Sequence, residues 1–376
     1  MNNTTTKEIL LLLLRYAGGN ADAECAERLK VLAHGDVDWD ALIRMATKQG
    51  MTLMAHDGYM VAGLDADMSC SLNARENRKT KLTWKGLEIP LTTKYHRQQD
   101  VIKTLSHYYA KNGIRMMVIK GYGVSLAYPV PEHRWASDID IYCFDEHDKS
   151  NKLIEKQDVK VDYSEHKHTT FILNKETIEN HHSFLNVHAH KSSAQIERIL
   201  HEILQREGTR EADGLLVPSP NFNVLYLLRH AAENFAALSA NLRQLLDWAL
   251  YVRKYHDEID WQWFMSTIDK VGMRQYLDMV IAISVRYLGF APELFPEYQI
   301  SDKLLERSLN DIIKPEFLEE HPSNIFSEVI YKLRRWKANT WKHDMVYRES
   351  LLTSFMTQMW SHILKPSTIV YGMKNN

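Results

Sequence analysis

The two ends of the chain repeat apolar residues with the period of an amphipathic helix. Residues 1–112 show no strand-like alternation, and apolar runs such as Ile9–Leu14 lie among good helix formers. From Asn221 onward nearly every segment has helical periodicity again. We therefore predict a helical region at each end of the chain. The helices expected in the second region are Val224–Ala237, Leu242–Tyr255, Trp261–Asp269, Arg274–Leu288 and Ile325–Tyr347.

A long polar segment, residues 73–112, ends the first helical region. It contains Pro90, which lacks a backbone N–H and clashes with the preceding turn of a helix. We therefore predict either two helices here or one kinked helix. Asn112-Gly113 is expected to end it, because both residues tolerate the left-handed conformation.

The middle of the chain has the pattern of short strands. Apolar runs of strand length alternate there with turns, and a helix is expected over residues 193–206. Asn174-Lys175 lies between two of these runs and predicts a tight hairpin. The expected strands are Ile114–Ile119, Ser137–Phe144, Val159–Tyr163, Thr169–Leu173 and Thr177–Leu185.

These patterns predict an α+β fold, in which a small mixed β-sheet lies between two helical regions. We place an N-terminal helical region at residues 1–91, the α/β core at 92–206 and a C-terminal helical domain at 207–376. The composition, 45% hydrophobic and 25% charged, is that of an ordinary folded protein, and 15 Gly with 10 Pro exclude collagen-like and disordered chains.

Charge and cysteine content exclude several other classes of protein. The 46 basic and 48 acidic residues nearly cancel, so no overall field attracts the chain to nucleic acid or membrane. Cys25, Cys70 and Cys143 form no CxxC pair, which argues against a disulfide framework or a zinc ribbon. The apolar run near the start is too short to span a membrane. We expect a cytoplasmic protein without a membrane partner.

The segment Ser137–Ile141 carries the strongest signal for chemistry. On a strand, side chains alternate between faces, so Asp138 and Asp140 project the same way while Ile139 enters the core. Their α-carbons are then roughly 6–7 Å apart, which lets both carboxylates reach one divalent-ion site. A D-x-D pair alone is also common at solvated strand edges, so its neighbours decide the interpretation.

Both neighbouring segments favour phosphate chemistry. Upstream, a strand leads into Lys120-Gly121 and a short helix, where a glycine permits close backbone approach and a helix start favours phosphate. Downstream, the strand candidate that begins at Thr177 carries a third carboxylate, Glu179, with His181 on the same face. Together these features predict a site for a nucleotide and metal ions.

The order strand, Lys-Gly, helix, D-x-D strand, hairpin and Glu strand resembles the nucleotidyltransferase superfamily related to DNA polymerase beta. More narrowly, it resembles bacterial uncharacterised nucleotidyltransferases in which Lys-Gly replaces the usual Gly-Ser pair. The motifs cover residues 118–190. The resemblance implies a nucleotidyltransferase core, a nucleoside triphosphate (NTP) substrate, two Mg²⁺ ions and release of pyrophosphate.

The resemblance also implies roles for the carboxylates. Asp138 and Asp140 would ligate both Mg²⁺ ions, and Glu179 would complete the set and activate the acceptor hydroxyl, as a base or through its metal. Asp162 and Asn186 are competing positions for the slot of Glu179.

Five further residues match the nucleotide-binding positions of the family. Lys120 and Gly121 would hold the β- and γ-phosphates, and Arg134 would neutralise phosphate charge. Ser137 matches the small polar residue before the first aspartate. His181 would orient the third carboxylate or touch substrate, and a plain hydrogen-bonding role is the alternative.

Other histidines have simpler interpretations. His166-x-His168 and His188-x-His190 have neither cysteine partners nor an H-E-x-x-H spacing, so we expect structural or solvent-facing histidines rather than zinc ligands.

Arg243 and Asp247, four residues apart, are expected to pair on one helix face. In the resembling family such a pair, with a histidine like His230, could close the active-site cleft; the alternative is an ordinary surface ion pair.

Two basic segments are candidates for binding RNA. Arg75–Arg115 and Tyr331–Arg348 combine basic and aromatic residues that suit RNA, although charged helix faces over buried tryptophans have the same composition.

The leading hypothesis is a Mg²⁺-dependent enzyme that transfers a nucleoside monophosphate to a hydroxyl of RNA, a small molecule or a protein. The alternatives are an inactive nucleotide-binding scaffold and an RNA-binding protein.

Overall fold

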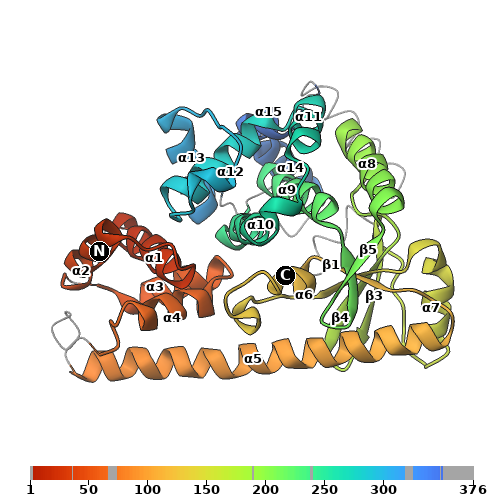
Figure 1. Ribbon diagram of the computed structural model, residues 1–376, viewed down its shortest axis with the longest axis horizontal. Helices are drawn as coiled ribbons and strands as arrows, with labels where there is room; N and C mark the ends of the chain where they lie inside the picture. The colour runs from red at the N-terminus through yellow and green to blue at the C-terminus, as the bar shows by residue number, and fades with distance from the viewer. Residues whose placement is uncertain are drawn as a thin grey trace.

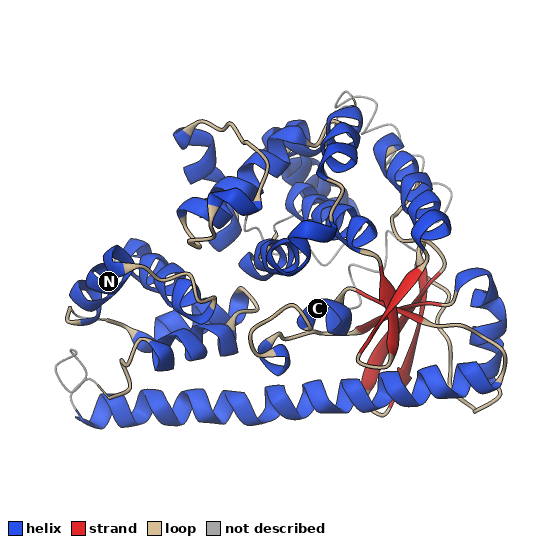
Figure 2. Cartoon of the chain, viewed as in Figure 1, coloured by secondary structure: helices blue, strands red, loops and turns tan. Residues whose placement is uncertain are grey.

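A mixed β-sheet, the long helix beneath it and two groups of helices make up the α+β architecture predicted from the sequence (Figures 1 and 2). The structure is a computed structural model. It describes residues 3–35, 37–66, 74–188, 190–237, 240–317, 325–347 and 349.

Four helices at the N-terminus pack around the apolar run Ile9–Leu14, all of which is buried. The first and fourth helices touch closely, because a Cβ at Gly58 would lie 1.9 Å from the carbonyl oxygen of Leu13. Only glycine therefore allows this contact. The four helices are α1 (Asn3–Ala17), α2 (Ala23–Ala33), α3 (Trp39–Lys48) and α4 (Thr52–Val61).

The long helix α5 (Ala74–Lys111) runs beneath both the N-terminal helices and the sheet (Figure 1). It is one helix that continues through Pro90, so the expectation of two helices is wrong. Contacts hold both of its halves in line: Lys79 pairs with Asp40 of α3, and Arg97 pairs with Glu176 of the sheet. Tertiary contacts thus compensate for the backbone hydrogen bond that the proline removes.

The six-stranded sheet has the order β3-β4-β2-β1-β6-β5. β2 is antiparallel to β1 and parallel to β4, and Asn174-Lys175 joins β3 to β4 with positive φ at both residues, as a type I′ hairpin turn requires. The predicted hairpin is therefore confirmed. The strands are β1 (Met117–Ile119), β2 (Ile139–Tyr142), β3 (His168–Leu173), β4 (Glu176–His181), β5 (Thr209–Ala212) and β6 (Leu215–Pro218).

One predicted strand is wrong, and one hairpin was missed. Val159–Tyr163 is not a strand and contributes only an isolated bridge between Asp162 and Thr170. The hairpin β5–β6 was not predicted, although its Asp213-Gly214 turn is a strong hairpin signal. Because β6 pairs with β1, the sheet extends beyond residue 206, where the core was expected to end.

The two faces of the sheet have different partners. Ile139, Ile141 and Ile178 pack with Val101 and Leu105 of α5 in one apolar cluster. The opposite face turns toward the C-terminal helices. Three shorter helices, α6 (Gly121–Ser125), α7 (His147–Glu155) and α8 (Lys191–Glu207), connect the strands.

The C-terminal helices confirm the predicted helical region. One further helix, α13, was not predicted, and the expected helix over 325–347 is divided at Asn339. The bounds are α9 (Pro220–Ala237), α10 (Leu242–Tyr255), α11 (Trp261–Val271), α12 (Arg274–Arg286), α13 (Asp302–Ile313), α14 (Ile325–Ala338) and α15 (Thr340–Val346).

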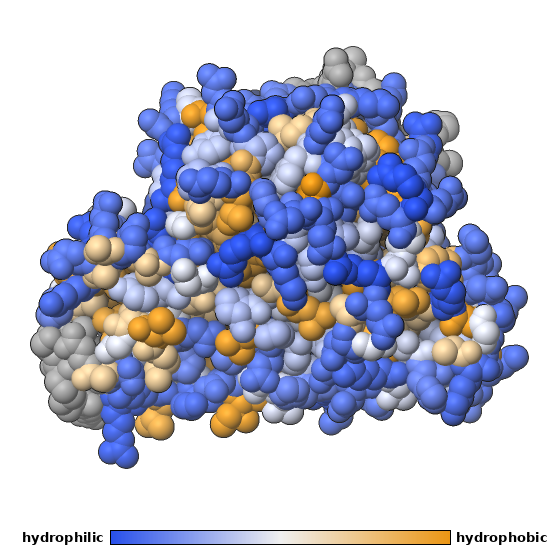
Figure 3. Space-filling view, viewed as in Figure 1, coloured by the Kyte–Doolittle hydropathy of each residue, from blue (hydrophilic) through white to orange (hydrophobic). Residues whose placement is uncertain are grey.

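Part of the basic, aromatic composition near the C-terminus is explained by packing. Lys342 and Asp311 form an ion pair in which both side chains are fully buried, and Trp341 packs edge-on against Phe235 and under the guanidinium of Arg307. The face shown in Figure 3 is mostly hydrophilic with scattered apolar side chains. Among the helices that the structure describes, none has both the length and the apolar character to cross a membrane.

Candidate active site

The three candidate carboxylates meet on the face of the sheet that turns toward the C-terminal helices. Asp140 and Glu179 are register partners on the parallel strands β2 and β4, and Asp138 lies two residues before Asp140. Burial, with Asp140 and Glu179 close by, raises the pKa of Asp138. Three acidic groups therefore share one site, as a divalent cation would require.

Asp140 is the most tightly held of the three. Its Oδ1 lies 2.6 Å from Lys120 Nζ and 2.9 Å from His181 Nε2, and its side chain is almost completely buried. Burial alone would raise the pKa of Asp140, but Lys120 and the hydrogen bond to His181 lower it well below its usual range. Asp140 is thus a permanent anion of the site.

Lys120 reaches the carboxylates from an unusual backbone conformation. It follows β1 and precedes α6 with a φ of 52°, which residues other than glycine adopt rarely. Although burial disfavours its charge, Asp140, Tyr226 and Glu179 raise the pKa of Lys120 above its usual value. Gly121 follows with a φ of 30°. Backbone strain of this kind is concentrated at functional sites.

Glu179 lies between two imidazole rings. Its Oε2 is 3.5 Å from His181 Nε2 and 3.4 Å from Nδ1 of His168, the first residue of β3. Burial raises the pKa of Glu179, but His181, His168 and Lys120 together outweigh this effect and lower it. Burial lowers the pKa of His168 to about 4. His168, which was expected to be structural or solvent-facing, is buried and lies beside the carboxylates.

Helix α9 closes the site from the opposite side. Lys120 Nζ lies 6.0 Å from the ring centroid of Tyr226, and burial with Lys120 and Lys167 nearby holds the pKa of His230 well below its usual range. Burial and the proximity of Lys120 also lower the pKa of Lys167. Glu179 and Asp140 act on Lys167 in the opposite direction, so this second lysine lies beside the same carboxylates. Sequence analysis missed both Lys167 and Tyr226.

Arg134 is bound by a carboxylate of the C-terminal helices. Its Nε and Nη2 donate to Asp247 Oδ1 and Oδ2 of α10 at 3.0 and 2.7 Å, and Tyr128 donates to the same carboxylate. The expected pair between Arg243 and Asp247 is therefore wrong. Arg243 instead donates to the carbonyl oxygen of Trp135 at 2.9 Å. Arg134 fastens the loop before the D-x-D strand to the C-terminal helices.

The remaining candidates lie at the margin of the site. Ser137 is exposed, and its carbonyl oxygen accepts a hydrogen bond from Lys94 at 2.9 Å. Asp162 bridges to the outer edge of β3, two strands farther from Asp140 than Glu179 is. This order of strands favours Glu179 over Asp162 as the third carboxylate.

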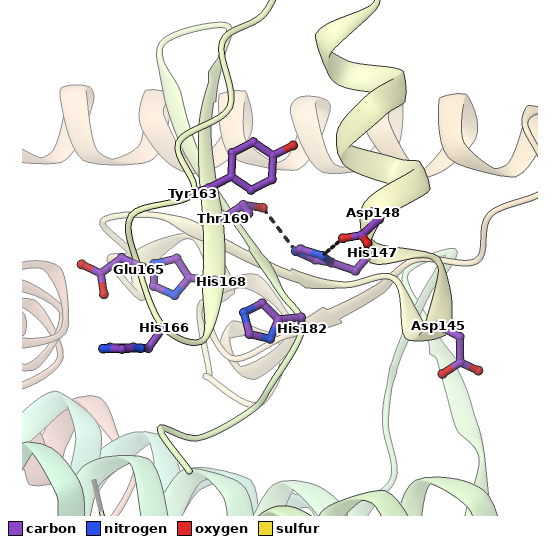
Figure 4. Close-up of a pocket in the computed structure, with 9 residues that line it drawn as sticks. All are labelled: Asp145, His147, Asp148, Tyr163, Glu165, His166, His168, Thr169 and His182. Carbon is purple, nitrogen blue, oxygen red and sulfur yellow. Dashed lines mark hydrogen bonds and ion pairs between the residues drawn. The ribbon is translucent and has the colours of Figure 1, made fainter. Parts of the chain in front are cut away.

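A cavity of about 530 Å³ adjoins the cluster at the edge of the sheet (Figure 4). His168 takes part in both the cavity and the carboxylate cluster. His147, at the start of α7, lies within hydrogen-bonding distance of Asp148 and Thr169. The cavity is lined by Asp145, His147, Asp148, Tyr163, Glu165, His166, His168, Thr169 and His182.

Comparison with known proteins identifies a family for the chain. No curated protein and no solved structure matches the chain. The sequence model of a family described as "Uncharacterised nucleotidyltransferase" matches residues 35–289, well over half of the chain and every candidate site residue described above. The chain therefore belongs to this family of uncharacterised nucleotidyltransferases.

Proposed function

We propose that the protein transfers a nucleoside monophosphate from an NTP to an acceptor hydroxyl, with Mg²⁺ as cofactor and pyrophosphate as leaving group. The observation that carries the proposal is the placement of Asp138, Asp140 and Glu179 on one face of the sheet, in contact with the charge of Lys120. Family membership supports nucleotidyl transfer in general. We also propose that the chain belongs to the polymerase beta-like superfamily, in the group in which Lys-Gly replaces the usual Gly-Ser pair.

The residues fit the proposed metal. Mg²⁺ prefers carboxylate oxygens together with substrate phosphates. Burial and then repulsion by Asp140 and Glu179 raise the pKa of Asp138, and a bound cation relieves that repulsion. We assign Asp138 and Asp140 as the principal ligands and Glu179 as the acceptor-side carboxylate. When bound, Mg²⁺ would supply Lewis-acid stabilisation of the charge that develops on the phosphates.

Each residue then has a defined part in the reaction. Lys120 exchanges its contact with Asp140 for oxygens of the β- and γ-phosphates, and Lys167 supplies a second cation nearby. The acceptor oxygen forms a bond to the α-phosphorus as the bond to the pyrophosphate oxygen breaks. Glu179 takes the hydroxyl proton. Such a displacement needs positioning and electrostatics but no covalent enzyme intermediate.

The transfer itself can be tested without knowing the acceptor. The full chain, purified without chelator, is incubated with Mg²⁺, each α-labelled NTP and a lysate divided into RNA, protein and metabolite fractions. We expect label in one fraction with wild type and none with Asp140→Asn. Equal labelling by both proteins would contradict the proposal. Retention of RNA or nucleotide without transfer would instead support an RNA-binding protein or an inactive scaffold.

Lys120→Ala is expected to weaken ATP and GTP binding to the same extent. Loss of a charged hydrogen bond to phosphate costs about 1–3 kcal/mol, and phosphate contacts do not distinguish bases. Calorimetric titration with both nucleotides in the presence of Mg²⁺ measures the effect. Lys270→Ala, an exposed lysine of α11, is the control and should bind as wild type does. Selective loss of one nucleotide would assign Lys120 to the base instead.

A further inference from the structure

Two histidines flank Glu179 with the spacing of metal ligands. The hairpin places His168 directly opposite His181, and their ring centroids are 5.1 Å apart. Potential ligand atoms of His168, Glu179 and His181 all lie within 4.8 Å of one another. An ion about 2.1 Å from tetrahedral ligands holds those ligands about 3.4 Å apart, and the two histidine nitrogens are 3.4 and 3.5 Å from Glu179 Oε2.

His168 also presents an unsatisfied nitrogen to this cluster. Its side chain is only 8% exposed, and Nδ1 has no hydrogen-bond partner within the described part of the chain. Buried polar atoms are rarely left in this state, because the loss of hydration is then uncompensated. The carboxylate of Glu179 lies 3.4 Å from this nitrogen. A cation between the two would satisfy both the nitrogen lone pair and the carboxylate charge.

His181 is held in the orientation of a metal ligand. Its Nδ1 lies 3.1 Å from the carbonyl oxygen of Ser183, which can only accept, so Nδ1 carries a proton. Metal-ligating histidines usually donate their other ring nitrogen to a backbone carbonyl in this way. Nε2 consequently faces Asp140 and Glu179, where a metal ion would replace its proton.

The donor set distinguishes this site from a magnesium site. Mg²⁺ is bound through oxygen in a nearly ideal octahedron, whereas imidazole nitrogen favours divalent transition metals. We propose that His168, Glu179 and His181 bind a first-row transition-metal ion, next to the carboxylates of Asp138 and Asp140. This inference deepens the proposed function, on which its catalytic role rests, because it gives the acceptor-side ion a different chemical identity from the Mg²⁺ that accompanies the NTP.

Binding of Co²⁺ alone tests the proposal. The full chain is stripped with chelator, titrated with Co²⁺ without nucleotide and followed by visible absorption and equilibrium dialysis. We expect one ion per chain, an intense nitrogen-ligated spectrum and retention in a 100-fold excess of Mg²⁺. Because a second-shell partner alone is worth about 10–100-fold in affinity, loss of a ligand in His168→Ala should cost about 100-fold or more.

Two further variants keep the test decisive. His188→Ala removes an exposed histidine outside the cluster and should bind Co²⁺ as wild type does. Should His168→Ala fail to fold, as judged by thermal unfolding, Glu179→Gln removes another ligand and should weaken binding comparably. The spectrum of hydrated Co²⁺, displacement by equimolar Mg²⁺, or wild-type affinity in both ligand variants would overturn the proposal.

The Co²⁺-binding experiment and the nucleotidyl-transfer experiment can each refute one proposal without refuting the other. Co²⁺ binding is measured without nucleotide, so a histidine-dependent site in a protein that transfers no label refutes the proposed function alone. Transfer of label by a protein whose Co²⁺ affinity does not depend on His168 or Glu179 refutes the transition-metal site alone.

Discussion

Asp138→Asn is expected to reduce nucleotidyl transfer by at least about 10²–10³-fold without lowering the stability of the fold. Removing one preorganised electrostatic contact costs that much in other enzymes, and Asp138 would contact the metal directly. Its ionised form is disfavoured in the folded protein, because burial and the neighbouring Asp140 and Glu179 raise its pKa. A neutral asparagine removes this repulsion, so thermal unfolding should be unchanged or occur at a higher temperature.

The combination of lost activity and retained stability separates a functional carboxylate from a structural one. Asp140→Asn should lose activity as well, but at a cost in stability, because it leaves the buried Lys120 without its closest partner. Asp158→Asn is the matched control, since this exposed aspartate occupies a left-handed turn that asparagine tolerates. A folded Asp138→Asn protein that transfers label at the wild-type rate would remove Asp138 from the site.

The parts of the site that sequence analysis located depend on short-range patterns. The period of two along β2 put Asp138 and Asp140 on one face, and the two-residue hairpin was evident from Asn174-Lys175. The same hairpin also defines a register, in which Leu173 faces Glu176 and His168 faces His181. His168 could therefore have been placed at the site by counting back from the turn.

Other parts of the site depend on contacts that no local pattern contains. The spacing of Arg243 and Asp247 suggested a pair four residues apart, whereas the partner of Asp247 is Arg134, 113 positions away. Tyr226 comes from a distant helix and becomes part of the site only when α9 packs over the sheet. Lys167 comes from the loop before β3, where its carbonyl oxygen accepts hydrogen bonds from the backbone N–H groups of His182 and Ser183. A lysine and a tyrosine at these positions of the sequence do not by themselves predict that the side chains lie at the site.

Arg134 and Asp247 form a long-range buried ion pair. We expect Asp247→Asn to lower the free energy of unfolding by about 3–5 kcal/mol. Their side chains are only 6% and 7% exposed and share two hydrogen bonds. Removing the carboxylate charge leaves a buried guanidinium uncompensated, and breaking one side of a buried ion pair costs about that much. Urea unfolding at pH 7 measures the difference from wild type.

The pH dependence of this difference identifies its electrostatic origin. Burial alone would raise the pKa of Asp247, but Arg134 lowers it below the value for the unfolded chain. A carboxyl with a lowered pKa stabilises the fold above its unfolded pKa, about 3.9, and loses that contribution as the pH falls. The difference in the free energy of unfolding between wild type and Asp247→Asn should therefore decrease as the pH falls from 7 to 3.

The control is Asp302→Asn, which breaks an exposed ion pair with Arg286 and should cost no more than about 1 kcal/mol. An Asp247→Asn protein as stable as this control would show that the buried pair does not hold the loop before the D-x-D strand in place.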